Sequence, residues 1–483
     1  MEQMNGGKYE YEAILERSFS RQDRKTMGWC ATVAIFVVIF TFCIFFKPYI
    51  TDDDDQNNAS FPSPLSNLEV PTGDSLNLQA TVYDGINIAP QPYSKIKEVK
   101  PVCEVKRRRF DICDANGGDI RVIANSSTIF VASNDHSNIM SWNIRPYARK
   151  GDEAAMGSVR TLTVKQLHPS HQQIPPCTTK YDVPAVVFST GGYAGNLFHD
   201  FTDLIIPLYL TSREFEGEVQ FLVTDKRPRW ITKFKDVLQT LSKHEIIDLD
   251  RIKNGDNVFC FPRIIVGLKA NKEFSINNVS SDHNISMKNF TAFLRNAYNL
   301  KRGNIVTNEK LLQPPRLLVI ARNKTRRLVN ANEVSAAAEN MGFKVVVRET
   351  DSNMTKISKF VNGFDVLVGV HGAGLSNMVF LPENAVVVQI VGLGMDWIAK
   401  NDFEVPSLDM GLRYLGYKIG LNESSLSEKY PAGHQVLSNS SAIRVKGWKA
   451  FSAVYLQGQD VRVDVNRFRG TLLKALHLLH ANN

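Results

Sequence analysis

Short apolar runs alternate with amphipathic stretches along the chain from residue 185 onward. Runs of four to six apolar residues are typical of strands that are buried on both faces of a sheet, and the stretches between them have helical spacing. We predict strands at 185–188, 219–223, 263–266, 316–320, 343–347, 365–370 and 385–390. We predict helices at 196–210, 231–241, 331–341, 357–364 and 376–380. This alternation predicts an α/β fold in which helices cover parallel sheets.

The predicted strands fall into two sets, which are separated by the proline pair Pro314 and Pro315. Each set predicts one doubly wound, Rossmann-like domain, and we place the first at residues 101–310 and the second at 311–483. Ligands of such folds bind at the carboxyl ends of the strands. We therefore expect the functional site in a cleft between two facing domains.

An uncharged segment precedes this body. Residues 26–46 carry no charged side chain, and as a helix they would span about 30 Å, the thickness of a hydrocarbon core. Basic residues cluster at 17–25 and favour a cytoplasmic N-terminus. We predict a cytoplasmic tail at 1–25, a transmembrane anchor at 26–46, a flexible stem at 47–100 and a lumenal body. A cleaved signal peptide is the alternative, but its apolar region is shorter and ends in small residues, which are absent here.

Sequons and cysteines agree with a lumenal body. Asn-x-Ser/Thr sequons follow the anchor and none precedes it; the asparagines are Asn58, Asn125, Asn278, Asn284, Asn289, Asn323, Asn353, Asn422 and Asn439. Such sequons are glycosylated in the secretory pathway. The body holds four cysteines, Cys103, Cys113, Cys177 and Cys260. Four cysteines form two disulfides in any of three connectivities, and an oxidising compartment favours their pairing.

Composition narrows the class of protein. Of 483 residues, 43% are hydrophobic and 22% are charged, which excludes a mostly disordered chain. The net charge of the whole chain is +8, but residues 1–100 contain 9 Lys and Arg against 13 Asp and Glu, so the remainder carries a net charge of about +12. A basic body indicates an anionic partner or simply a solvated basic surface, and the charge alone does not decide between them.

Two polar clusters follow predicted strands of the second domain. The first is the turn 369–377, where His371, Gly372, Ala373 and Gly374 precede Asn377. Glycines at a strand-to-helix turn let backbone amides approach an anion such as a pyrophosphate, although a turn needs glycine for steric reasons as well.

The second cluster is basic and follows the strand 316–320. It contains Arg322, Arg326 and Arg327, which are suited to neutralising phosphate. A solvated basic loop is the alternative interpretation.

A glycine turn in the first domain leads into the predicted helix 196–210. Tyr193 and Asn196 in this turn are candidates for the acceptor side, and His199 and Asp203 lie four residues apart on one helix face. A carboxylate beside an imidazole fixes its tautomer and raises its basicity, so we predict His199 as a general base held by Asp203. A surface pair without function, or a carboxylate base at Asp203 or Asp200, is the alternative. No metal-binding motif stands at a strand end, so we expect no catalytic metal.

In combination, these motifs resemble plant glycosyltransferase family 61, in the group that acts on xylan in grasses. The similar stretches are 103–121, 145–150, 188–208, 322–327, 370–377, 410–414 and 459–464. The resemblance implies a GT-B fold and an inverting transfer of arabinofuranose or xylose from a UDP-sugar to xylan. It also implies a Golgi membrane enzyme of type II topology that needs no cofactor and binds no nucleic acid.

The resemblance also divides the site. It assigns residues 311–483 and their arginine and glycine clusters to the donor nucleotide, and residues 101–310 to the acceptor. Association with itself or with other Golgi glycosyltransferases is expected of such enzymes. A lumenal sugar-binding protein without turnover and a related N-acetylglucosaminyltransferase are the alternatives; a hydrolase is disfavoured because a Gly-x-Ser-x-Gly elbow is absent.

Overall fold

The computed structural model describes residues 102–123, 126–132, 140–168, 171, 174–252, 257–276, 285–305, 313–349 and 352–480. These residues belong to one compact unit, Pro92–Asn483. The predicted tail 1–25, anchor 26–46 and stem 47–100 lie outside the described residues. Within the described ranges, no helix is long and apolar enough to cross a membrane.

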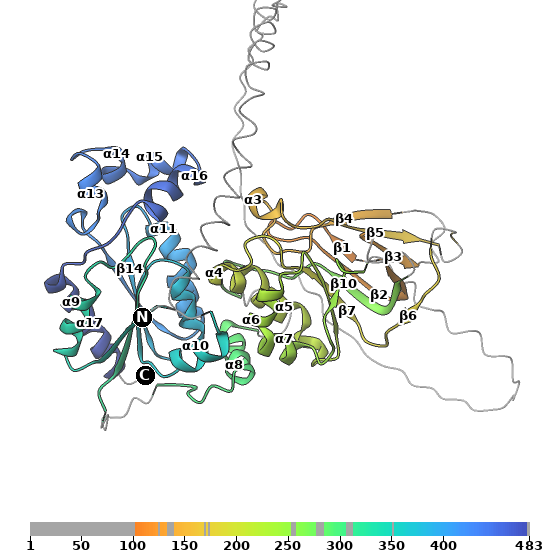
Figure 1. Ribbon diagram of the computed structural model, residues 1–483, viewed down its shortest axis with the longest axis horizontal. Helices are drawn as coiled ribbons and strands as arrows, with labels where there is room; N and C mark the ends of the chain where they lie inside the picture. Colours follow the sequence, from red (N-terminus) through yellow and green to blue (C-terminus); the bar gives the residue numbers. More distant parts are fainter. Residues whose placement is uncertain are drawn as a thin grey trace, which may run out of the picture. The chain divides into compact units, whose positions relative to one another are not determined.

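The N-terminal part of this unit is built on a ten-stranded sheet (Figure 1). Its strands are β1 Val102–Glu104, β2 Ile112–Ile123, β3 Thr128–Ala132, β4 Met140–Ile144, β5 Leu162–Leu167, β6 Thr179–Lys180, β7 Ala185–Ser189, β8 Gln220–Thr224, β9 Ile247–Asp248 and β10 Val258–Val266. The order is β4-β5-β3-β2-β10-β7-β8-β9, with β1 beside β2 and β6 beside β10.

Strand β10 is the seam between two kinds of pairing. On one side β7, β8 and β9 follow it in parallel, and on the other side β2 and β3 run antiparallel. The predicted strands 185–188, 219–223 and 263–266 are confirmed and form the parallel part. The flank beyond β10 is antiparallel except for the parallel β3–β5 pair, so the N-terminal sheet is mixed. This flank was not predicted from the sequence.

The expectation of helices on both faces is wrong for this sheet. One apolar cluster joins Val187 and Leu222 of the parallel strands with Ile129 and Val164 of the flank. This face is therefore covered by other strands, whereas Val186 and Phe188 point to the opposite face, into the cluster that contains the helices. The flank alternates buried and less buried positions, as in β5, where Leu162 and Val164 are buried and Thr163 and Lys165 are partly exposed, so it lacks the continuous apolar runs of the parallel strands.

Helices of the N-terminal part cover one face of the sheet. They are α3 Glu153–Met156, α4 Leu197–His199, α5 Ile206–Ser212, α6 Pro228–Lys233, α7 Lys235–Leu241 and α8 Met287–Ala297, with a 3-10 turn at Arg213–Phe215. The predicted helix 196–210 is present but not regular, because a π-helical segment, Asp200–Ile205, separates α4 from α5. The predicted helix 231–241 is divided into α6 and α7 at Phe234.

The C-terminal part contains a five-stranded sheet in which every neighbouring pair is parallel. Its strands are β11 Arg316–Ile320, β12 Lys344–Arg348, β13 Val366–Val370, β14 Val386–Val391 and β15 Arg413–Lys418. The order β12-β11-β13-β14-β15 is that of a doubly wound sheet. The four strands predicted here are confirmed within one residue at each end.

Helices lie on both sides of this second sheet, with α9 and α17 on one side and α10 on the other (Figure 1). The helices are α9 Ala331–Glu339, α10 Met354–Val361, α11 Asp396–Ala399, α12 Val405–Asp409, α13 Leu426–Lys429, α14 Gln435–Ser438, α15 Ser440–Val445, α16 Trp448–Phe451 and α17 Val465–His480. Two further π-helical segments cover Lys400–Glu404 and Ser452–Gln457, and 3-10 helices cover Ala373–Phe380 and Leu421–Glu423. The predicted helix 376–380 is therefore a 3-10 helix that begins three residues earlier.

Aromatic side chains join the two parts into one core. Phe198 lies 5.7 Å from Phe403, and Phe201 lies 5.9 Å from Phe380, measured between ring centroids. Each pair has one member from each side of residue 310 and packs edge to face, the arrangement that aromatic rings favour. The domain boundary at 310 stays a prediction, but the described parts on either side of it share a continuous apolar cluster.

The four body cysteines form two disulfides, Cys103–Cys113 and Cys177–Cys260. The first joins β1 to β2, and the second ties the segment before β6 to β10. Five sequon asparagines fall on described residues, and all are exposed: Asn289, Asn323, Asn353, Asn422 and Asn439. The prediction that the cysteines pair is confirmed; Asn58, Asn125, Asn278 and Asn284 lie outside the described residues.

Candidate active site

Residues from both parts line one cleft with a volume of about 1150 Å³. The N-terminal part contributes Tyr193, Asn196 and His199, and the C-terminal part contributes Arg326 and His371. All five were predicted as site residues from the sequence. The structure therefore brings the helix motif of the first part and the two loops of the second part to a common space.

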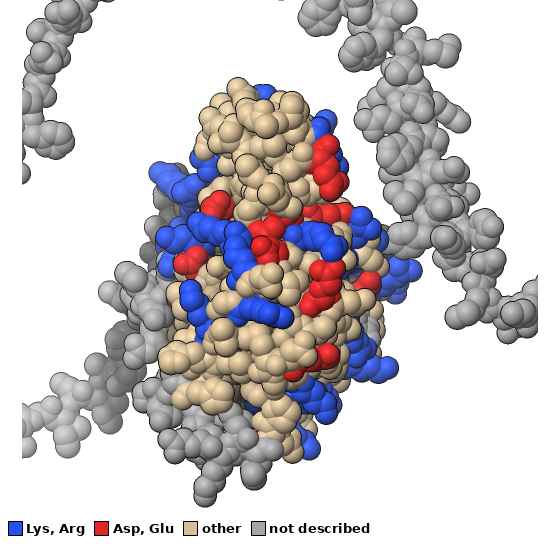
Figure 2. Space-filling model, turned by 90° about the vertical axis from the view of Figure 1, so that its left-hand side faces the viewer, with Lys and Arg blue, Asp and Glu red and all other residues tan. Residues whose placement is uncertain are grey.

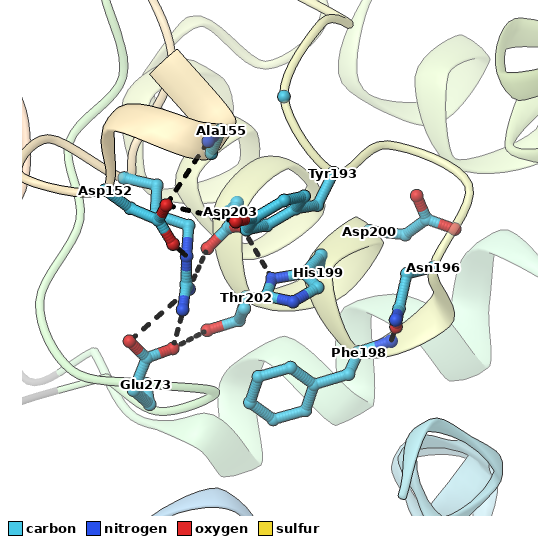
Figure 3. A network of polar contacts seen from close by, with 12 residues as sticks. Asp152, Ala155, Tyr193, Asn196, Phe198, His199, Asp200, Thr202, Asp203 and Glu273 are labelled. Carbon is cyan, nitrogen blue, oxygen red and sulfur yellow. Dashed lines mark hydrogen bonds and ion pairs between the residues drawn. The ribbon is translucent and has the colours of Figure 1, made fainter. Parts of the chain in front are cut away.

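His199 and Asp203 form the pair that their spacing predicts. His199 Nδ1 lies 2.9 Å from Asp203 Oδ2, and Asp203 is fully buried. Figure 3 shows the imidazole turned toward Asp203, whereas Asp200 lies on the other side of the helix. The Nδ1 atom is engaged by the carboxylate, so Nε2 is the nitrogen left for a ligand.

Asp203 is held by more than the imidazole. Its Oδ1 accepts hydrogen bonds from Arg109 Nη2 at 3.1 Å and Arg149 Nη1 at 3.2 Å, and its Oδ2 accepts one from the Tyr147 hydroxyl at 3.1 Å. Burial and the Asp203 carboxylate raise the pKa of Tyr147, so this hydroxyl remains a donor. Two cations and a phenol compensate the buried negative charge of Asp203. A lone carboxylate in an apolar site would have no such compensation.

Glu273 completes this network and was not predicted from the sequence. Arg109 Nη1 donates to Glu273 Oε1 at 2.6 Å. The Thr202 hydroxyl donates to Glu273 Oε2 at 3.2 Å, as Figure 3 shows. Burial opposes ionisation of Glu273, but the hydrogen bond and charge of Arg109 and the charge of Arg149 outweigh it and lower the pKa of Glu273 to about 2. Glu273 therefore holds the arginines in place and remains ionised.

Asp200 is a structural residue rather than a second base. Its Oδ1 accepts hydrogen bonds from the Gly195 amide at 2.6 Å and Trp230 Nε1 at 2.9 Å, and its Oδ2 lies 2.7 Å from Lys233 Nζ. The carboxylate is fully buried and does not line the cleft. It ties the glycine turn to α6, which disfavours the alternative that Asp200 is the base.

The turn before α4 positions the two acceptor-side candidates. The Asn196 side chain caps α4 by accepting a hydrogen bond from the Phe198 amide at 3.1 Å. The Tyr193 ring lies 4.6 Å from the His199 ring, and its hydroxyl donates to Asp152 Oδ1 at 3.0 Å. Gly192 has φ +54°, and a Cβ there would lie 2.5 Å from the Tyr147 ring, so glycine is required at this turn.

Two arginines on the opposite side of the cleft approach the glycine loop. A Cβ on Gly372, which has φ +145°, would lie 2.6 Å from Arg322 Nη1 and 3.0 Å from Arg326 Nη2. Arg326 donates to the His371 carbonyl at 2.9 Å and to the Leu456 carbonyl, and Arg322 donates to the Thr325 carbonyl at 2.9 Å. Glycine at 372 therefore leaves room for two guanidinium groups.

No carboxylate among the described residues forms an ion pair with Arg322 or Arg326. Burial lowers the pKa of both, and burial together with the Arg322 charge lowers the pKa of Arg326 to about 10. Both side chains remain cationic near neutral pH. Two adjacent and partly buried cations without a counter-charge are a site for an anion.

The other members of these two loops have different roles. Arg327 is half exposed and forms a bidentate pair with Asp460, with Nη2 2.7 Å from Oδ2. Asn377 is buried and donates from Nδ2 to the Gly374 carbonyl at 2.8 Å, which braces the loop. Ala373 lines the cleft together with Arg326, whereas Arg322, Arg327, Gly374 and Asn377 do not. The structure thus supports an anion at Arg322 and Arg326 and gives Arg327 a partner of its own.

Asp402 is a cleft residue that the sequence did not single out. It lies on the π-helical segment Lys400–Glu404, and its Oδ2 is 3.9 Å from His371 Nε2. Burial and the Glu273 charge raise the pKa of Asp402 to about 8, so it is largely protonated near neutral pH. No local sequence motif marks Asp402 or Glu273, because their neighbours come from distant parts of the chain.

Positive and negative side chains are mixed on one face of the molecule (Figure 2). Figure 2 shows one face on which Lys and Arg side chains are interrupted by Asp and Glu. No group of three or more His, Cys, Asp or Glu side chains in the described part is arranged to hold a metal ion. On this face the positive net charge does not form one basic patch, so the cleft arginines are the stronger candidates for anion binding.

Comparison with known proteins agrees with the geometry of the cleft. A family model described as Glycosyltransferase 61 matches residues 168–388. The rice (Oryza sativa subsp. japonica) alpha-1,3-arabinosyltransferase XAT2 is 42% identical over 82% of this chain and 67% of its own length. The rice beta-1,2-xylosyltransferase XYXT1 is 42% identical over 78% of this chain and 84% of its own length.

Solved structures are more distant. The dodecameric iron-containing heptosyltransferase TibC is 10% identical, with a TM-score of 0.30 over 77% of this chain and 95% of that one. This similarity is too low to support an inference, whereas the two rice proteins match this chain on both sides of the cleft.

Proposed function

Because this chain belongs to glycosyltransferase family 61, we propose that it transfers arabinofuranose or xylose from a UDP-sugar to xylan with inversion at the anomeric carbon. The rice relatives, an arabinosyltransferase and a xylosyltransferase, support a pentose donor. One structural observation carries the proposal: His199, which is held by Asp203, and Arg326, which lies beside Arg322 at Gly372, line the two sides of a single cleft.

The chemistry follows from this arrangement. A xylan hydroxyl oxygen attacks the anomeric carbon, the bond from that carbon to the diphosphate oxygen breaks, and its electron pair leaves with UDP. His199 Nε2 takes the hydroxyl proton, and Asp203 stabilises the imidazolium that forms. Arg322 and Arg326 bind the diphosphate and stabilise its increasing charge.

The donor and acceptor sides follow the two sheets. The second sheet has the strand order of a doubly wound fold, and the arginine and glycine loops follow its strands β11 and β13. Ligands of such sheets bind at the carboxyl ends of the strands. We therefore assign UDP to the C-terminal part and xylan to the side of His199, in a fold of GT-B type.

The cations of the cleft are proposed to replace a metal ion. Guanidinium groups fixed before the reaction can stabilise a departing diphosphate as a bound cation would. Transfer should therefore continue at an unchanged rate in EDTA. Loss of transfer in EDTA with recovery on addition of manganese would contradict this part of the proposal.

Location in the Golgi membrane, with the body in the lumen, is part of the proposal. It is supported by the two disulfides and by five exposed sequon asparagines in the described part. In sealed Golgi vesicles, protease should leave the body intact until detergent is added. Digestion of the body without detergent would place it in the cytosol.

Release of UDP in the presence of acceptor tests the proposed reaction. The full-length chain in detergent is incubated with UDP-arabinofuranose, UDP-xylose or UDP-N-acetylglucosamine, with and without xylohexaose. We expect acceptor-dependent UDP release with one pentose donor. Binding of UDP without release would support a sugar-binding protein, and release with UDP-N-acetylglucosamine alone would support the N-acetylglucosaminyltransferase.

A further inference from the structure

A chain of hydrogen bonds behind His371 determines which of its ring nitrogens carries a proton. Gln389 on β14 is fully buried, and its Nε2 lies 2.8 Å from His371 Nδ1. The Tyr414 hydroxyl on β15 donates to Gln389 Oε1 at 2.6 Å. In the described part of the chain, the Tyr414 hydroxyl has no other hydrogen-bond partner, so its proton is donated to the amide oxygen of Gln389. The amide therefore has its oxygen toward Tyr414 and its NH₂ group toward the imidazole.

This orientation selects one tautomer. An amide NH₂ group only donates, so His371 Nδ1 must be the unprotonated acceptor. The proton of the neutral ring is then on Nε2. His371 lines the cleft and Gln389 does not, so Nδ1 faces the protein interior and Nε2–H is the free donor.

The groups around the ring keep it neutral and leave this proton available. Burial, Arg326 and Arg322 lower the pKa of His371 to about 3. Nε2 is 3.9 Å from Asp402 Oδ2, which is too long for a hydrogen bond, and the Phe403 ring packs edge to face at 5.2 Å. The Nε2–H group therefore has no acceptor among the described residues.

We propose that Tyr414 and Gln389 are positioning residues that hold His371 as a neutral Nε2–H donor to the leaving diphosphate. This inference rests on the proposed function, because a diphosphate is the ligand only if the donor is a nucleotide sugar. Arg326 donates to the His371 carbonyl, so this hydrogen bond joins the loop that carries the cation to the loop that carries the imidazole. As the glycosidic bond to phosphate breaks, charge increases on the bridging oxygen, and a fixed donor in a desolvated site stabilises it.

The tautomer can be observed directly in the full chain. Histidine ring ¹⁵N chemical shifts distinguish a protonated from an unprotonated nitrogen, and His371→Asn identifies the His371 signals. We expect an unprotonated Nδ1 and a protonated Nε2 that do not titrate between about pH 5.5 and 8. In Tyr414→Phe the amide is free to rotate, so both tautomers should appear and UDP affinity should fall several-fold.

A charged replacement of Gln389 tests the role in binding. In Gln389→Glu the carboxylate accepts a proton from Nδ1, so a neutral ring presents the Nε2 lone pair to the diphosphate. Only the protonated ring then donates, and UDP affinity should fall by about tenfold between pH 5.5 and 8 relative to wild type. Gln389→Met, which has no charge, should keep the wild-type pH profile, as should the control Gln220→Glu, a buried glutamine on β8 outside the cleft.

The outcomes separate this inference from the proposed function. Parallel pH profiles for Gln389→Glu and wild type, or a protonated Nδ1 in a wild-type chain that binds UDP, would overturn the inference alone. If Gln389→Glu does not fold, the wild-type ¹⁵N shifts and Tyr414→Phe decide the question. Absence of UDP binding to the wild-type chain would overturn the proposed function and with it the role of His371 at the diphosphate.

Discussion

On the N-terminal side of the cleft, Asp203 and Glu273 are bound by Arg109 and Arg149, whereas on the C-terminal side Arg322 and Arg326 have no carboxylate partner in the described part. We call the first set the closed network, because each of its charged side chains forms an ion pair with an oppositely charged side chain in the folded protein. We call the second set the open set, because its two cations remain available to a ligand. Compensated charges hold the geometry of a base, and uncompensated charges are available to an anionic substrate.

His199 should show the largest effect, because it lines the cleft and is the proposed base, with Nδ1 held by Asp203 and Nε2 left for the substrate. His199→Ala should lower kcat by about 10²–10⁴-fold while UDP affinity stays near wild type, since general-base catalysis contributes about this much. Steady-state kinetics measure the change in kcat, and calorimetry measures the UDP affinity. His244→Ala, at a surface pair with Glu218, is the matched control.

A different result for His199→Ala would reassign the base. If the variant loses UDP-sugar affinity but keeps its turnover at saturation, His199 is a donor ligand. The base would then be another carboxylate of the cleft, because Asp203 and Asp200 are buried and fully bound.

Asp203→Asn should break the closed network itself. The substitution leaves Arg109 and Arg149 with less counter-charge, and removal of one partner of a buried ion pair costs about 3–5 kcal/mol. Chemical denaturation should show this loss of unfolding free energy. Glu218→Gln, in an exposed pair with Lys243, should leave the stability nearly unchanged. Equal stabilities of Asp203→Asn and wild type would mean that the arginines do not depend on this carboxylate.

Arg326→Ala tests the open set. A charge-assisted hydrogen bond is worth about 1.5–3 kcal/mol, so UDP affinity should fall by about ten- to a hundredfold, and Arg322→Ala should behave similarly. Arg327→Ala is the control from the same loop, because Asp460 already binds its guanidinium. If calorimetry finds a greater loss of UDP affinity in Arg327→Ala than in Arg326→Ala, the diphosphate binds outside the cleft.

Acid should weaken the closed network in a defined range. The pKa of Glu273 is lowered from 4.5 to about 2 in the folded protein, so the unfolded chain binds more protons between these values. The stabilisation is therefore complete above about pH 4.5 and is lost as the pH falls toward 2. Unfolding measurements from pH 6 to 2 should show a smaller slope for Glu273→Gln. Identical slopes would show that the carboxylate is not held by the arginines.

The parallel strands could be predicted because they are continuous apolar runs, as 316–320 and 366–370 are. The antiparallel flank could not, since β2 contains Asn116, Gly117 and Asp119, and its register against β10 shifts at a bulge. Its side chains need only one buried face, so its polarity resembles that of a loop.

The site was predictable where its chemistry is local. His199 and Asp203 are four residues apart, and Arg322 and Gly372 each lie two residues after the end of a predicted strand. Glu273 and Asp402 have no such signal, because the residues that shift their pKa values lie far away in the sequence. Arg327 shows the opposite case. Its position after a predicted strand indicated a phosphate ligand, but its guanidinium forms an ion pair with Asp460, which lies far away in the sequence.

Each of the three π-helical segments in the described part of the chain adjoins the cleft: one follows His199, one carries Asp402, and one carries Leu456. A π-helical turn contains more residues than an α-helical turn. When two sequences are aligned, such a turn acts as a one-residue insertion inside a helix. Transfer of residue numbers between family members across these helices therefore needs a gap at 200–205, 400–404 or 452–457 wherever the other protein has a regular helix. An alignment without that gap would shift every functional residue on one side of the turn by one position.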